Sequence, residues 1–179
     1  MCAVLFVGLG APVIACDPGG EQDDDGEDDD GEDEGEDDGG TAVPDATCMS
    51  GLRWDGGDEE SPRMHPGMDC LGCHAEEGEA EEYTIGGTVY AGLSEKDDCF
   101  GLADVIVEIT GADGEVLRMT TNEAGNFTRE HASVEVPYTA KLIRDGREIA
   151  MTTPQTVLSC NVCHAEVGVN MAPGRILAP

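Results

Sequence analysis

The sequence predicts a mainly β protein whose central part is a small antiparallel β-sandwich. Between residues 83 and 152, short apolar runs alternate with polar residues, and turn sequences such as Asp113-Gly114 and Asp145-Gly146 separate them. No stretch of this region has a convincing helical period. We therefore expect two irregular segments to flank the sandwich and a disordered acidic linker to precede it.

Six strands are expected in the sandwich, because each run is bounded by Gly, Asn or Asp at a turn. They cover residues 83–90, 104–110, 115–121, 126–128, 138–144 and 147–152. Residues 41–66 are expected to be irregular, since Gly, Pro and acidic residues dominate there. Trp54 is the large apolar residue of that region, and its position leaves two roles open: packing on a cofactor, or plugging the sandwich.

The chain contains one five-residue pattern twice. Cys70-Leu71-Gly72-Cys73-His74 returns as Cys160-Asn161-Val162-Cys163-His164. C-x-x-C-H is the attachment sequence of a c-type haem, because two nearby thiols add to the porphyrin vinyl groups and the next residue offers an imidazole to the iron. A zinc finger would have its two halves much closer in sequence, and a catalytic dithiol needs no following His.

The repeat therefore predicts two covalently attached c-type haems. The predicted attachment residues are Cys70, Cys73, Cys160 and Cys163, with His74 and His164 as the proximal iron ligands. The repeat extends to C-x-x-C-H-A-E-x-G, so we expect Gly78 and Gly168 to close the same short turn, since Gly accepts positive φ.

The sixth iron ligands have four candidates, namely Met64, His65, His131 and Met151. Met151 is favoured for the second haem, because no spare His lies near the second motif in sequence. For the first haem Met64 and His65 are equal candidates, since adjacent residues of an extended chain point to opposite sides. Counting alone also allows His65 and His131 to give both haems two imidazoles, which would keep both potentials low.

The first 15 residues predict a secretory signal peptide, because they are almost wholly apolar and too short to span a bilayer. Val13-Ile14-Ala15-Cys16 resembles a bacterial lipobox, which implies cleavage before Cys16 and lipidation of that residue. No Lys or Arg precedes Arg53, so the basic region of an ordinary signal is missing. We expect a lipid-anchored protein facing the periplasm or the surface of a Gram-negative cell.

Residues 16–47 are predicted to form a solvated spacer, because Asp, Glu and Gly dominate and have nothing to bury. No window matches a calcium-binding EF-hand loop. The formal net charge of the 179 residues is −30, which argues against nucleic acid as a partner. With 4% aromatic residues the core must be small, and one ordered domain is expected.

Cys48 and Cys99 remain after the other cysteines are assigned to the signal, the lipid and the haems. By elimination we expect them to form a disulfide, which an oxidising compartment permits. The predicted divisions of the chain are a signal peptide at 1–15, the lipidated linker at 16–47, the first haem segment at 48–82, the sandwich at 83–152 and the second haem segment at 153–179.

Two resemblances support this division. The paired motifs resemble those of di-haem and multi-haem cytochromes c. Residues 84–152 resemble the carboxypeptidase regulatory-like family, a transthyretin-like β-sandwich, in Gly87-Thr88-Val89-Tyr90 and in Thr121-Asn122-Glu123-Ala124-Gly125-Asn126-Phe127. That family is mostly a structural or binding module, so this resemblance implies no catalysis.

Together these features predict an electron-transfer lipoprotein whose partners are redox proteins of the periplasm or cell surface. The acidic charge is expected to lower the haem potentials by stabilising the ferric state, an effect that salt weakens. Two alternatives stay open. One is a small di-haem enzyme of the peroxidase type, which needs a five-coordinate iron with acid–base groups over it. The other is a partner-binding sandwich whose haems are sensors or structural staples.

Overall fold

Antiparallel strands dominate the part of the chain that the structure describes. This computed structural model describes residues 42–57, 61–78 and 83–179. The predicted signal peptide, Cys16 and most of the acidic linker lie outside these residues. Among the described residues, no helix has the length and apolar character needed to cross a bilayer.

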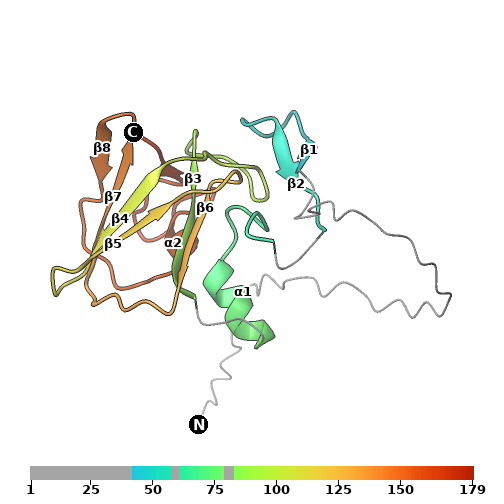
Figure 1. Cartoon of the computed structure of the whole chain (residues 1–179). Helices are drawn as coiled ribbons and strands as arrows, with labels where there is room; N and C mark the ends of the chain where they lie inside the picture. Colours follow the sequence, from blue (N-terminus) through green and yellow to red (C-terminus); the bar gives the residue numbers. More distant parts are fainter. Residues whose placement is uncertain (1–41, 58–60, 79–82) are drawn as a thin grey trace, which may run out of the picture. The chain divides into compact units, whose positions relative to one another are not determined.

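Two sheets make up the main body (Figure 1). The larger is antiparallel and has the order β5 (Val116–Thr120), β4 (Ile106–Thr110), β7 (Thr139–Arg144) and β8 (Arg147–Ala150). The smaller has the order β6 (Asn126–Glu130), β3 (Tyr83–Tyr90) and β9 (Ile176–Leu177), with β9 parallel to β3. The predicted mainly β, antiparallel and sandwich-like fold is confirmed at this level.

The core lies where inward-facing residues of both sheets meet. In β4 the side chains of Val107 and Ile109 are buried, whereas Ile106 is exposed, as the two-residue period of a strand requires. Ile85 and Val89 of β3 pack in the same cluster. Each such buried side chain contributes about 1.5–3 kcal/mol of hydrophobic stabilisation relative to exposure.

The predicted strands agree with the observed ones to within one or two residues at most ends. The expected run 83–90 is β3 itself. Asp145 and Gly146 both have positive φ, 50° and 73°, which is the backbone of the tight turn predicted between β7 and β8. Strand β9 comes from the predicted second haem segment, so that segment takes part in the smaller sheet.

The prediction that residues 41–66 are irregular is wrong for the first part of this segment. Strands β1 (Ala42–Pro44) and β2 (Leu52–Trp54) form a hairpin. The predicted disulfide between Cys48 and Cys99 is confirmed, with the two Cα atoms 5.4 Å apart, and it ties the hairpin to the rest of the chain. Trp54 is buried against Phe100 and Ala124 in a second small core, separate from the core between the two sheets.

The expectation that both flanking segments are irregular is also wrong in part. Both C-x-x-C-H motifs form short helices, α1 (Cys70–Glu77) and α2 (Cys160–Cys163). Asp69 caps α1 by accepting a hydrogen bond from the backbone N–H of Gly72 at 3.1 Å, and Gly78 ends the helix at φ 67°. Helices of eight and four residues are too short to show a hydrophobic period in the sequence.

Candidate functional site

The two motif helices begin beside one strand, β3, although 90 positions separate them in sequence. Gly86 and Gly87 of β3 make room for them. A Cβ atom on Gly86 would lie 3.0 Å from Sγ of Cys70, and a Cβ atom on Gly87 would lie 2.8 Å from Cβ of Cys160. A side chain at Gly87 would therefore collide with Cys160, and one at Gly86 would make a tight contact with Cys70. Glycine pairs inside a strand often mark such a close approach.

The residues that precede the two helices contact each other directly. Ser159, at the N-cap position of α2, donates a hydrogen bond through Oγ to Oδ1 of Asp69 at 2.5 Å. The same Asp69 oxygen caps α1. Ser159 also forms a parallel bridge with Gly86, whose N–H donates to the carbonyl of Leu158 at 3.3 Å. One carboxylate thus joins the starts of both motifs.

A buried polar network continues this connection. Asn161, inside the second motif, accepts a hydrogen bond from the N–H of Thr88 at 3.0 Å and donates to the carbonyl of Met68 at 2.8 Å. Thr88 Oγ1 accepts from the N–H of Gly67 and donates to Oδ1 of Asn126. Asn161 and Thr88 are both buried. The network joins the chain just before the first motif, strand β3 and the second motif.

An apolar cavity of about 390 Å³ lies between the four-stranded sheet and the chain from residue 151 to residue 177. The second motif contributes Cys160, Cys163 and His164 to its wall. Val107 and Ile109 of β4 also line the cavity. The size and the predominantly apolar wall are typical of a cofactor site. None of Cys70, Cys73 and His74 lines this cavity.

The imidazole of His164 is oriented by the backbone. Its Nδ1 lies 2.9 Å from the carbonyl oxygen of Gly174, and a carbonyl can only accept, so Nδ1 carries the hydrogen. In the neutral ring Nε2 then keeps its lone pair for a metal. Histidine ligands in metal sites usually have a hydrogen-bond acceptor of this kind.

Arg175 holds the segment that supplies this carbonyl. It is buried, and its guanidinium donates to the carbonyls of Glu95 at 2.7 Å and Gly67 at 3.1 Å. It also pairs with Asp97 at 2.5 Å. Since Gly174 precedes Arg175, these contacts restrict the position of the acceptor of His164. Arg175 also lines the cavity.

The cavity wall includes two methionines. Met151, the favoured sixth ligand for the second haem, is partly buried and also packs against the main core. Met171 is fully exposed at a backbone φ of 69°. The structure thus brings Met151 to the same cavity as the second motif, with Met171 as a thioether at its surface.

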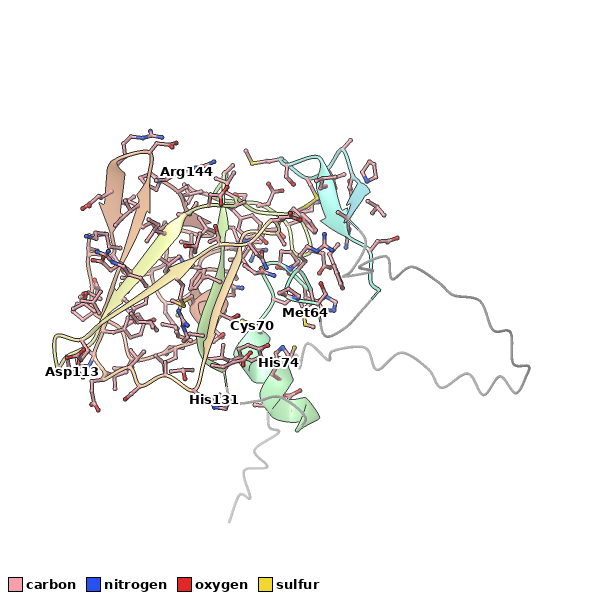
Figure 2. The ribbon with its side chains drawn as sticks, in the orientation of Figure 1. Met64, Cys70, His74, Asp113, His131 and Arg144 are labelled. Atoms are coloured by element: carbon pink, nitrogen blue, oxygen red, sulfur yellow. A yellow bond between two sulfur atoms is a disulfide. The ribbon has the colours of Figure 1, made fainter. Side chains whose placement is uncertain are left out.

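The first motif has a different setting. On α1, the ring of His74 lies 4.7 Å from the ring of Tyr83, centroid to centroid. Tyr83 pairs with Glu130 across β3 and β6, and His131 follows Glu130. Figure 2 shows Cys70 and His74 on α1, with His131 near the end of β6. Of the spare histidines, His131 is the one that this chain of contacts connects to the first motif.

Met64 and His65, the sequence candidates for the first haem, lie beside the second small core of Trp54, Phe100 and Ala124, here called the Trp54 cluster. Met64 packs against this cluster. His65 has its Nδ1 3.0 Å from Oδ1 of Asp98, and its ring lies edge-on to Trp54 at 5.9 Å. The described contacts of these two residues do not include a residue of the first motif.

The four motif cysteines are not all free thiols. Cys70, Cys160 and Cys163 are free thiols. Burial raises the pKa of Cys70 to about 11 and the pKa of Cys160 to about 12, so both stay protonated at neutral pH. Cys73 is disulfide-bonded. A sulfur in a disulfide cannot also form a haem thioether, so attachment at the first motif requires this bond to be absent.

The predicted shared turn after the motifs is found only once. Gly78 ends α1 with positive φ, but α2 already ends at Cys163 and Gly168 does not have positive φ. The difference follows from composition. Ala75, Glu76 and Glu77 favour helix, whereas Val167, Gly168 and Val169 do not.

Sequence reasoning missed the residues that assemble the site, namely Asp69, Thr88, Ser159, Asn161 and Arg175. Asp69 and Ser159 could have been recognised as helix N-caps, because Asp and Ser are common N-cap residues and each precedes a motif cysteine. Asn161 and Arg175 carried none, since their partners are far away in sequence. One further cluster with metal-ligand spacing, Cys48, Glu95 and Cys99, has both sulfur atoms in the disulfide.

The second motif therefore fits a covalently held haem: two free thiols and an oriented imidazole face an apolar cavity. Comparison with known proteins adds no assignment to this geometry. No protein-family model, no curated protein and no solved structure matches the chain.

Proposed function

We propose that this protein is an electron-transfer cytochrome that carries two c-type haems on a transthyretin-like β-sandwich. The observation that carries the proposal is the apolar cavity lined by Cys160, Cys163 and His164. A haem held there would supply a reversible one-electron couple. The protein would supply the covalent links, the axial ligands and the shielding from water.

At the second site, Cys160 and Cys163 would hold the group and His164 would be the proximal ligand. The hydrogen bond from Nδ1 of His164 to Gly174 keeps Nε2 available and increases the basicity of the ring. Met151 is proposed as the sixth ligand, because it shares the cavity with the motif. A thioether in this position would raise the potential of the second haem.

At the first site, Cys70 and Cys73 would hold the haem and His74 would be the proximal ligand. His131 is proposed as the sixth ligand in preference to Met64 and His65, because the pairing of Tyr83 with Glu130 brings it toward His74. Two imidazoles would give this haem the lower potential of the two.

We propose that the protein is exported and anchored to the membrane by a lipid on Cys16. Its proposed partners are redox proteins of the periplasm or cell surface. The acidic composition favours partners with a cationic docking face.

The proposal is tested by expressing the full chain with export and haem-attachment machinery. Intact mass and a pyridine haemochrome spectrum should show two covalent haems per chain. The double variants C70A/C73A and C160A/C163A should each retain one haem. A correctly exported chain that carries zinc, or that has no Soret band, would contradict the proposal.

A further inference from the structure

We propose that Cys48, Glu95 and Cys99 form a redox-gated binding site for one divalent zinc ion. The site exists only after an external dithiol has reduced the Cys48–Cys99 disulfide. None of the three residues belongs to a C-x-x-C-H motif, so the inference does not depend on the proposed function.

The possible ligand atoms of these three residues already lie close together. Both sulfur atoms and a carboxylate oxygen of Glu95 lie within 4.8 Å of one another. In a tetrahedral zinc site, with Zn–S of about 2.3 Å and Zn–O of about 2.1 Å, neighbouring ligand atoms are about 3.6–3.8 Å apart. Once the S–S bond is broken, side-chain rotations of about 1 Å therefore bring the three atoms to the positions that zinc requires.

The carboxylate of Glu95 is the observation that points to a cation. Glu95 is 3% exposed, and among the residues that the structure describes no Lys or Arg forms an ion pair with it. Both of its oxygens share one donor, the backbone N–H of Met49, at 3.1 Å. Buried carboxylates are normally paired with a cation or bound to a metal. A divalent ion between Glu95 and the two sulfur atoms would supply the positive charge.

Backbone contacts hold the two cysteines near each other without the help of the disulfide. Arg53 of β2 forms an antiparallel bridge with Cys99. The next residue, Phe100, donates its N–H to the carbonyl of Leu52 at 3.0 Å. Cys48 precedes β2 in the same hairpin, and the Cα atoms of the two cysteines are 5.4 Å apart. Reduction of the bond therefore leaves both thiols in place.

Arg175 holds the third ligand residue. Its buried guanidinium donates from Nε to the carbonyl of Glu95 at 2.7 Å, and it also pairs with Asp97 two positions further on. These contacts do not involve the carboxylate of Glu95, which stays available for an ion. The site is therefore preorganised from two separate segments, the β1–β2 hairpin and the chain from residue 95 to residue 99.

The site forms in two steps. An external dithiol gives two electrons and two protons to the Cys48–Cys99 bond and becomes a disulfide itself, which leaves two thiols on the chain. Zinc then binds both sulfurs and the Glu95 carboxylate, and the two thiol protons pass to solvent. Three protein ligands leave the fourth tetrahedral position to a water molecule. Because the thiolate is the metal ligand, the disulfide state and the zinc-bound state exclude each other.

The first experiment measures zinc binding by the full chain in which the six cysteines other than Cys48 and Cys99 are replaced, namely C2A/C16A/C70A/C73A/C160A/C163A. The folded chain is reduced with a dithiol, the dithiol is removed anaerobically, and the chain is dialysed against zinc. The reduced chain should bind one zinc ion and the oxidised chain none. Adding C48A/C99A should abolish binding.

The role of the carboxylate is tested in the same chain by E95Q. This variant should bind zinc more than about tenfold more weakly, since even changes outside the ligand set cost about 10–100-fold. E135Q is the matched control, because Glu135 is exposed, and it should bind zinc as tightly as its parent. Equal binding in E95Q and its parent would overturn the three-ligand site. So would a reduced chain that binds no zinc, or a disulfide that the dithiol does not reduce in the folded chain.

The second experiment uses the wild-type chain, so it decides the inference even if the variant with six replacements does not fold. The reduced chain is treated with a thiol-alkylating reagent with and without zinc, and the modified cysteines are located by peptide mass mapping. Zinc should protect Cys48 and Cys99. Alkylation of both at the same rate with and without zinc would contradict the inference. That result would leave the proposed function intact, since the haem count is measured separately.

Discussion

Nδ1 of His164 lies 2.9 Å from the carbonyl oxygen of Gly174, and this contact selects the neutral tautomer in which Nε2 keeps its lone pair. The same contact fixes the orientation of the imidazole in the second motif. Arg175 stabilises this contact, because its side chain makes three hydrogen bonds and its backbone directly follows Gly174.

Under the proposed function, replacing His164 should remove the proximal ligand of the second haem without detaching the haem. In H164A the thioether links remain, so intact mass should be unchanged while half of the haem becomes high-spin. Added imidazole should restore the low-spin spectrum. H65A is the control, since His65 lies in the Trp54 cluster and its loss should leave the spectrum unchanged. An unaltered spectrum in H164A would contradict the assignment.

Under the proposed function, replacing Met151 should lower the potential of the second haem. Leu has a similar volume but no sulfur, so M151L should lose the weak near-infrared band that a ferric iron–methionine bond produces. M171L is the matched control, because Met171 lines the same cavity at its surface and should keep the band. If M171L loses the band and M151L keeps it, the sixth ligand is Met171 and not Met151.

Removing the Cys48–Cys99 disulfide should destabilise the fold. The bond links residues 51 positions apart, for which the chain-entropy model gives about 4 kcal/mol. In urea, the double variant C48A/C99A should unfold at a lower midpoint than the wild type, and a reductant should lower the wild-type midpoint by a similar amount. Equal midpoints with and without the bond would show that it does not constrain the unfolded chain.

Acid should weaken the outer face of the larger sheet through Glu108. Lys141 and Arg118 pair with this carboxylate from both neighbouring strands and hold its pKa below the ordinary value of 4.5. The stabilisation is therefore present above about pH 4.5 and is lost as pH falls through the lowered folded-state pKa. E108Q should melt at a lower temperature than the wild type at pH 7, and the difference should shrink at acidic pH.

The control for this effect is E135Q, since Glu135 is exposed and has no side-chain ion pair among the described residues. Its melting temperature should follow that of the wild type at every pH. A gap between E108Q and the wild type that stays constant from neutral to acidic pH would refute the electrostatic origin.

The strands could be predicted from the sequence because their signals are local. Alternation along 106–110 and the Asp145-Gly146 turn need no knowledge of distant residues. The Cys48–Cys99 pair was also predictable, although by elimination and not by geometry. The two motif helices were missed because four to eight residues are too few for a helical period.

The arrangement of the candidate site could not be predicted, because it depends on contacts between distant residues. Asp69 and Ser159 are 90 residues apart, and nothing in either motif indicates that they meet. The preference for Met64 or His65 at the first haem relied on nearness in sequence. The structure places both beside Trp54, whereas strand pairing brings His131 toward the first motif.

The glycine pair of β3 has a consequence for how this protein can diverge. A methyl group at Gly87 would lie 2.8 Å from Cβ of Cys160 and 2.9 Å from Cζ of Phe127, so even alanine would collide there. Gly86 is limited less strictly, because a methyl group there would lie 3.0 Å from Sγ of Cys70 and 3.2 Å from Cδ1 of Leu71. Descendants of this chain that keep Cys160 and Phe127 in place should therefore also keep Gly87.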